Sequence, residues 1–279
     1  MKAGDFMKQG RFKVVKFMDV GTSNPICNRL SLQLFDMIDS NLFNITKEER
    51  DKFMEIMLDI MKGLLTCEDT FKRIESIHNK FIEDLQSGEK PKITHNSISF
   101  DDPTDEIYEL FEALIVKLII VLRKSFKLPC VFYNVKIDGP KVFYKQVLNL
   151  FGENSKVVKM VEDDKKWFTE LYDLRGEFEH SKIELSRFDV FMDGEIKFAI
   201  PRVKTLNQSV IELSFQYMNY TFTYCEDLAV NILNERINPE AQIYSIPPEL
   251  QESNRSFCYK VGLSKEYEAE LLKNIKSTD

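Results

Sequence analysis

Apolar residues recur every three or four positions over long stretches of this chain, which is the spacing of an amphipathic helix. The clearest helix start is at Thr46, where Glu49 three residues later completes a capping box ahead of an apolar stripe. We predict one helix over 46–64 and a separate helix over 68–85, each with a single buried face.

The second half of the chain predicts further helices and one hairpin. The helix that begins near Pro103 is apolar over most of its circumference, so we expect it to be the central element of a bundle. Long helices are predicted over 155–180 and 206–237, and Asp193-Gly194 between them separates two runs with alternating apolar residues. The predicted fold class is therefore mainly α, a helical bundle with a small antiparallel β-hairpin near 183–200.

Polar and proline-containing segments divide the chain into four parts. The segment 89–103 is polar and has proline near both ends, which is typical of a linker. We therefore predict an N-terminal helical region over 1–88, a linker over 89–103, a helical domain with its hairpin over 104–237, and a C-terminal extension over 238–279.

Composition and charge narrow the functional classes. The chain has 22 phenylalanines with only 10 glycines and 9 prolines, which favours a packed core over disorder. The net charge of -7 counts against a broad nucleic-acid surface and leaves room only for a local basic site. The most apolar run, 113–122, is interrupted by Lys117 and is too short to span a bilayer, so we expect no membrane segment.

Neither a metal nor a cofactor is predicted from the motifs present. The five cysteines are widely spaced, with no Cys-x-x-Cys pair or Cys/His cluster, which argues against a zinc site and for reduced thiols in the cytoplasm. The sequence also contains no glycine-rich phosphate loop, no Gly-x-Ser-x-Gly elbow and no His-Glu-x-x-His helix. Among the common catalytic signatures, one short motif remains.

That motif is Arg175 followed five positions later by His180, at the end of the helix predicted over 155–180. A guanidinium is a fixed, planar donor for phosphate oxygens, and an imidazole exchanges a proton near neutral pH. At the end of a long helix in a helical domain, Arg-x4-His resembles the signature of the HEPN family. The resemblance implies a metal-independent endoribonuclease, of the toxin or defence type, that acts as a homodimer.

In such an enzyme His180 would be the proton carrier and Arg175 the phosphate contact, with RNA as substrate and a protein antitoxin or regulator as partner. The residues themselves leave a second interpretation open. Arg175 can pair with Glu179 one turn later, and His180 can favour the negative end of the helix dipole. The alternative is therefore a non-catalytic protein-interaction or scaffold protein in which the motif is structural.

The spacing also sets a geometric condition. Five residues along an ideal helix turn by about 140°, so the two side chains do not share one face. They converge only if the helix ends or distorts at Gly176, or if a second protomer completes the site.

Overall fold

The computed structural model describes most of the chain between residues 24 and 267. The described residues are 24–39, 42–87, 92–93, 98–99, 102–137, 139–180, 183–186, 190–192, 196–198, 201–204, 206–247, 249, 258–265 and 267.

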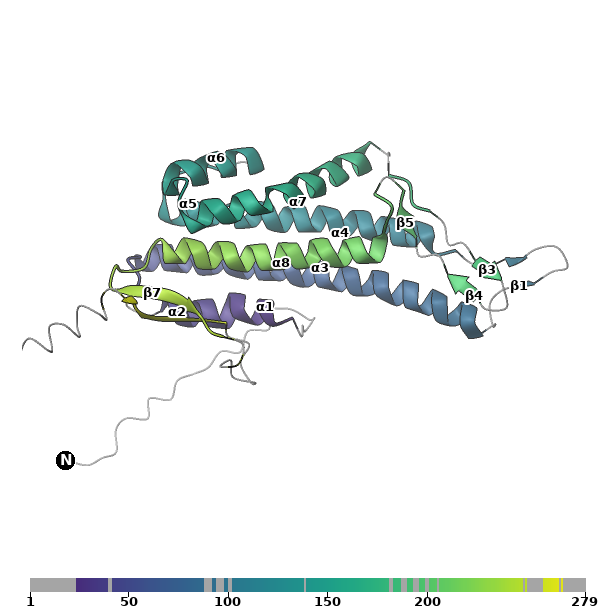
Figure 1. Ribbon diagram of the computed structural model, residues 1–279, viewed down its shortest axis with the longest axis horizontal. Coiled ribbons are helices and arrows are strands. Elements are labelled where there is room, and N and C mark those ends of the chain that lie inside the picture. The colour runs from purple at the N-terminus through teal and green to yellow at the C-terminus, as the bar shows by residue number, and fades with distance from the viewer. Residues whose placement is uncertain are drawn as a thin grey trace, which may run out of the picture.

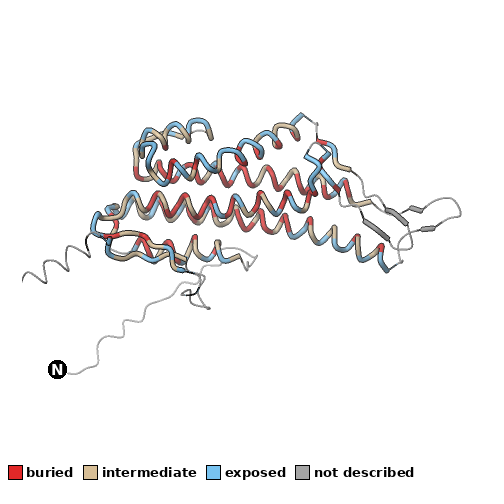
Figure 2. The backbone as a smooth tube through the Cα atoms, in the orientation of Figure 1, coloured by how far each residue is buried: buried red, intermediate tan, exposed pale blue. Residues whose placement is uncertain are grey.

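Four long helices run side by side along the longest dimension of the molecule (Figure 1). They are α3 (Lys47–Ser87), α4 (Thr104–Ser125), α7 (Lys156–Glu179) and α8 (Val210–Asn234). The predicted central helix, α4, packs against the other three. Its apolar positions are buried, and Figure 2 shows buried residues along the inward sides of all four helices.

Shorter elements cover one end of this bundle. Helix α6 (Pro140–Phe151) packs against α7, and α5 (Leu128–Phe132) contacts α3 and α8. On the other side lie α1 (Pro25–Asn28), the π-helix η1 (Arg29–Gln33) and α2 (Leu34–Ile38), which form one continuous helical stretch. A π-helix has wider turns than an α-helix and is rare outside functional or strained segments.

Four two-stranded antiparallel sheets complete the described structure. Their pairs are β1 (Lys92–Ile93) with β2 (Ile98–Ser99), β3 (Val190–Met192) with β4 (Ile196–Phe198), β5 (Arg202–Val203) with β6 (Gln208–Ser209), and β7 (Ala241–Ser245) with β8 (Tyr259–Leu263). The β3–β4 pair is the hairpin predicted near 183–200, so the predicted fold class is confirmed.

The two helices predicted over 46–64 and 68–85 form the single 41-residue helix α3, so that division was wrong. The predicted capping box does begin this helix: the Glu49 amide donates to Thr46 Oγ1 at 3.2 Å, and the Thr46 amide donates to Glu49 Oε2 at 2.7 Å. No proline or helix-ending glycine lies at 65–67, and the buried side chains of Leu64, Cys67 and Phe71 continue the inward stripe. The stripe therefore stabilises one uninterrupted helix.

One hydrophobic core includes residues from both sides of the predicted linker 89–103. Of the linker itself, the described residues are the pairs 92–93 and 98–99, which form β1 and β2, and its last two residues, 102–103. The division of the chain into four parts therefore stays a prediction.

Three buried thiols, those of Cys27, Cys67 and Cys225, lie where α1, α3 and α8 meet. Burial raises the pKa of Cys27 and of Cys67 to about 12, and it raises the pKa of Cys225 as well. The thiols are therefore protonated and unreactive in the folded protein.

Candidate functional site

Helix α7 carries the Arg-x4-His motif at its C-terminal end. The helix begins at the N-cap Ser155, whose hydroxyl accepts from the Val158 amide at 3.1 Å. It continues without a break through Gly176, and His180 is its C-cap residue, with its amide donating to the Gly176 carbonyl at 3.2 Å. The helix therefore does not end or break at Gly176.

Within one protomer the motif residues do not meet on one face. Because α7 is continuous, the Arg175 and His180 side chains leave it about 140° apart. Arg175 is held by Glu179, whose Oε1 lies 2.5 Å from Arg175 Nη2, and His180 is exposed. The ion pair one turn apart is the contact that the structural interpretation of the motif requires.

The helix surface between the two motif residues is half-buried at Tyr172 and has open space above Gly176. At about 100° per residue, Arg175 lies about 60° to one side of Tyr172 and His180 about 80° to the other, with Gly176 between them. A Cβ placed on Gly176 would meet no atom within 4 Å. We call the strip of α7 from Tyr172 through Gly176 to His180 the open stripe.

Charges of both signs surround the open stripe. Burial raises the pKa of the Tyr172 phenol. Arg123, which is exposed on α4, and Arg175 both lower this pKa and so oppose the effect of burial. Carboxylates lie close by on the same helix, at Asp173, Glu177 and Glu179. The stripe therefore presents two guanidinium groups near one tyrosine, with acidic groups that a bound phosphate would have to avoid.

A cavity of about 520 Å³ lies one turn before the motif, between α6 and α7. Tyr172 and Asp173 line its end, whereas neither Arg175 nor His180 lines it. The cavity and the open stripe share Tyr172, so they are neighbouring features of one helix surface.

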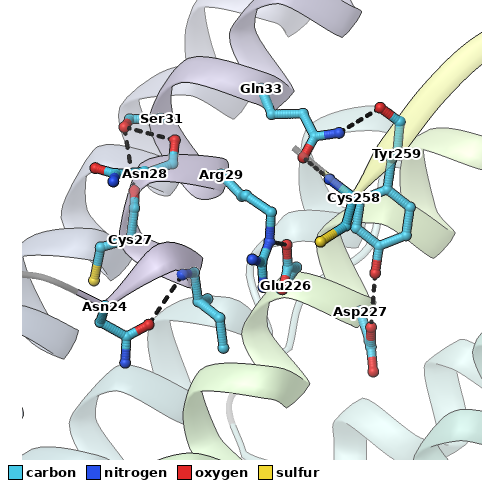
Figure 3. A network of polar contacts seen from close by, with 11 residues as sticks. Asn24, Cys27, Asn28, Arg29, Ser31, Gln33, Glu226, Asp227, Cys258 and Tyr259 are labelled. Carbon is cyan, nitrogen blue, oxygen red and sulfur yellow. Dashed lines mark hydrogen bonds and ion pairs between the residues drawn. The ribbon is translucent and has the colours of Figure 1, made fainter. Parts of the chain in front are cut away.

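A separate polar network ties the N-terminal helices to α8 and the C-terminal strands (Figure 3). Arg29 of the π-helix makes a two-pronged ion pair with Glu226 of α8, with 2.6 Å between Nη2 and Oε2. Only 12% of the Arg29 side chain and 6% of the Glu226 side chain are exposed. Gln33 hydrogen-bonds to the backbone of β8, accepting from the Cys258 amide at 3.1 Å and donating to the Tyr259 carbonyl.

Asp227, next to Glu226, is the carboxylate of this network with a perturbed pKa. Burial, followed by repulsion from Glu226, raises the pKa of Asp227 to about 6, although the Tyr259 hydroxyl donates to Asp227 Oδ1 at 3.3 Å. Asp164 adds to the repulsion, and Arg29 opposes it. Sequence reasoning missed this network because its members are separated by about two hundred positions and follow no motif.

The raised pKa predicts a pH-dependent stability. Between pH 4 and pH 6 the folded Asp227 binds a proton that the unfolded chain has already released, so its contribution to stability falls as the pH rises through 6. Asp227→Asn removes this pH-dependent contribution to the free energy of unfolding. We expect the variant to gain on the order of 1 kcal/mol in unfolding free energy relative to the parent between pH 4 and pH 7.5, since water still screens part of the carboxylate.

Urea unfolding of both proteins across that pH range measures this difference. If the difference in unfolding free energy between variant and parent stays constant from pH 4 to pH 7.5, the pKa of Asp227 is not raised in the folded protein.

Within the part of the chain that the structure describes, no group of three His, Cys, Asp or Glu side chains could hold a metal ion. The described helices also include none that is long and apolar enough to cross a membrane. Comparisons with family models, with curated proteins and with solved structures found no match to this chain, so the candidate site rests on its own geometry.

Proposed function

We propose that the protein is a cytoplasmic, metal-independent endoribonuclease of the HEPN type, with its site on the open stripe at the end of α7. The observation that carries the proposal is the exposed His180, which lies with the half-buried Arg175 on either side of an uncovered helix surface. Arg123 of α4 adds a second guanidinium beside Tyr172. A histidine can transfer a proton and arginines can stabilise negative charge on phosphoryl oxygens, so this set of groups is compatible with phosphodiester cleavage without a metal.

In the proposed reaction, His180 removes the proton of an RNA 2′-hydroxyl, which then attacks the adjacent phosphorus. The phosphorus–5′-oxygen bond breaks, and the leaving oxygen takes up a proton from water while His180 releases to the solvent the proton that it took. Arg175 donates to the phosphoryl oxygens and stabilises the negative charge that develops on them. The products are a 2′,3′-cyclic phosphate and a free 5′-hydroxyl.

The helical geometry gives this site two requirements. Because Arg175 and His180 are about 140° apart, the complete site needs two copies of the chain related by a two-fold axis, so that the Arg175 of one copy adjoins the His180 of the other. Arg175 must also exchange Glu179 for a phosphate. A protein regulator that covers the open stripe would block both steps.

The same ion pair favours a second candidate function, that of a non-catalytic helical interaction protein. Arg175 and Glu179 form an i,i+4 pair in an unbroken helix, and such a pair stabilises a helix without any further role. In this case the open stripe would contact another protein and not RNA.

Cleavage of single-stranded RNA in the presence of EDTA, comparing the parent with His180→Ala and Arg175→Ala, tests the proposal. We expect chelator-resistant cleavage by the parent and a loss of about 100-fold or more in each variant. Glu179→Gln should raise the activity by releasing Arg175, whereas an interaction protein would show only a small change in stability.

His78→Ala, which removes the histidine on α3, is the matched control and should leave cleavage unchanged. If the parent does not cleave RNA, or if His180→Ala cleaves as fast as the parent, the ribonuclease proposal fails and the interaction protein is favoured.

A further inference from the structure

The cavity between α6 and α7 has the size and lining of a small-molecule site. Its volume of about 520 Å³ lies within the range of ligand pockets in proteins. Its mouth opens to solvent, since Lys141, Lys165, Thr169 and Asp173 line it and are all exposed.

The interior of the cavity is apolar and rigid. Phe126 and Phe143 stack with their ring centroids 4.4 Å apart, and Phe168 meets Phe126 edge to face at 6.0 Å. With Val161 they form the buried wall of the cavity. Stacked rings that are fixed by their neighbours hold an apolar ligand with little loss of their own freedom.

The rim of the cavity is positively charged on one side. Lys141 lies in the first turn of α6. Lys165 lies on α7, with its ammonium 5.3 Å from the centre of the Tyr144 ring. Among the described residues neither lysine takes part in an ion pair, whereas the neighbouring Lys166 lies 4.0 Å from Glu170. The two rim ammonium groups are therefore available to an anionic group at the mouth.

From these features we infer that the cavity binds a small amphipathic acid. The alkyl or aryl body lies against Phe126, Phe143 and Phe168, and the carboxylate lies at the rim between Lys141 and Lys165. Neither Arg175 nor His180 lines the cavity, so the ligand contacts neither catalytic residue of the proposed ribonuclease, although Tyr172 belongs to both the cavity and the open stripe.

Isothermal titration of the full chain with decanoate and with decyltrimethylammonium tests the charge preference. The two probes share a ten-carbon chain and differ in the charge of the head group. We expect saturable binding of one decanoate per chain, and affinity for the cation weaker by at least about tenfold, because two charge-assisted contacts would be replaced by repulsion. Equal affinity for both probes, or no saturable binding of decanoate, would overturn the inference.

Paired variants locate the site. Lys141→Glu with Lys165→Glu should weaken decanoate binding by at least about tenfold, whereas Lys145→Glu with Lys166→Glu changes the net charge equally on the same two helices and should stay within about twofold. Thr169→Phe should also weaken binding by at least about tenfold, because it places a ring in the mouth of the cavity.

Thr223→Phe, at an exposed position of α8 away from the cavity, is the control for added apolar surface. Both positions are exposed, so the substitutions are compatible with folding, and urea unfolding verifies this. Unchanged decanoate affinity in Thr169→Phe would place the ligand elsewhere and refute the site. His180→Ala should bind decanoate as the parent does, which separates this inference from the ribonuclease proposal.

Discussion

Arg29→Met should lower the free energy of unfolding by about 3–5 kcal/mol, the largest change in stability that we expect from a single substitution in this network. The guanidinium is the ion-pair partner of Glu226, whose side chain is 6% exposed. Removing it leaves a carboxylate that is neither solvated nor paired, and methionine fills a similar volume without restoring the charge. Urea or thermal unfolding measures the change.

Arg175→Met is the matched control, because it removes the same side chain from an exposed i,i+4 pair and should cost less than about 1 kcal/mol. The double variant Arg29→Met, Glu226→Leu should recover much of the loss, since no charge is then left buried. If Arg29→Met and Arg175→Met cost the same, the Arg29–Glu226 pair contributes no more than a surface contact.

Gly63→Ala should destabilise the protein by about 1–2 kcal/mol, although alanine is the better helix former. Gly63 lies on α3 where it packs against α4, and a Cβ at this position would lie 2.5 Å from Val121 Cγ2. Val121 is buried and β-branched, so it cannot rotate away freely. Overpacking of this kind costs about 1–3 kcal/mol, which exceeds the gain of roughly 1 kcal/mol in helix propensity.

Gly176→Ala should have the opposite sign, with a gain of about 0.5–1 kcal/mol, because a Cβ there meets no atom within 4 Å. Combining Gly63→Ala with Val121→Ala should relieve the contact, so that the double variant loses less than the sum of the two single variants. Additive losses would show that the two residues do not contact each other closely.

Those parts of the fold that depend on local chemistry could be predicted from the sequence. The capping box at Thr46 is an interaction between residues three positions apart, so the neighbouring residue types reveal it. The β3–β4 hairpin is similarly local, since the turn residues and the alternating strands lie within one short segment. The division predicted at 65–67 was wrong although the sequence there contains no proline or helix-ending glycine, and the inward stripe of Leu64, Cys67 and Phe71 runs through it.

The C-terminal strands were missed for a related reason. Residues 241–245 and 259–263 each alternate in side-chain type, but they are thirteen residues apart and no short turn joins them. Their pairing is supported by Gln33, which contacts the backbone of β8 from the other end of the chain. A contact between residues more than 200 positions apart leaves no periodic signal in a single sequence.

For the candidate site, the sequence indicated which two residues to consider, and the structure added what surrounds them. The angle of about 140° follows from the spacing alone, provided that the helix is continuous. Its continuity through Gly176, the approach of Arg123 from α4 and the neighbouring cavity all depend on tertiary packing. That the proposed ribonuclease site needs a second protomer therefore depends on the continuity of α7, and the motif alone left it open.

The three buried thiols at the junction of α1, α3 and α8 allow opening of this part of the core to be measured. A water-soluble thiol reagent reaches Cys130 and Cys258, which are partly exposed, without any change in the fold. It reaches Cys27, Cys67 and Cys225 only when the packing around them opens, so their slow modification reports how often that opening occurs. The Arg29–Glu226 pair links η1 to α8 at the same junction, so we expect Arg29→Met to speed this modification.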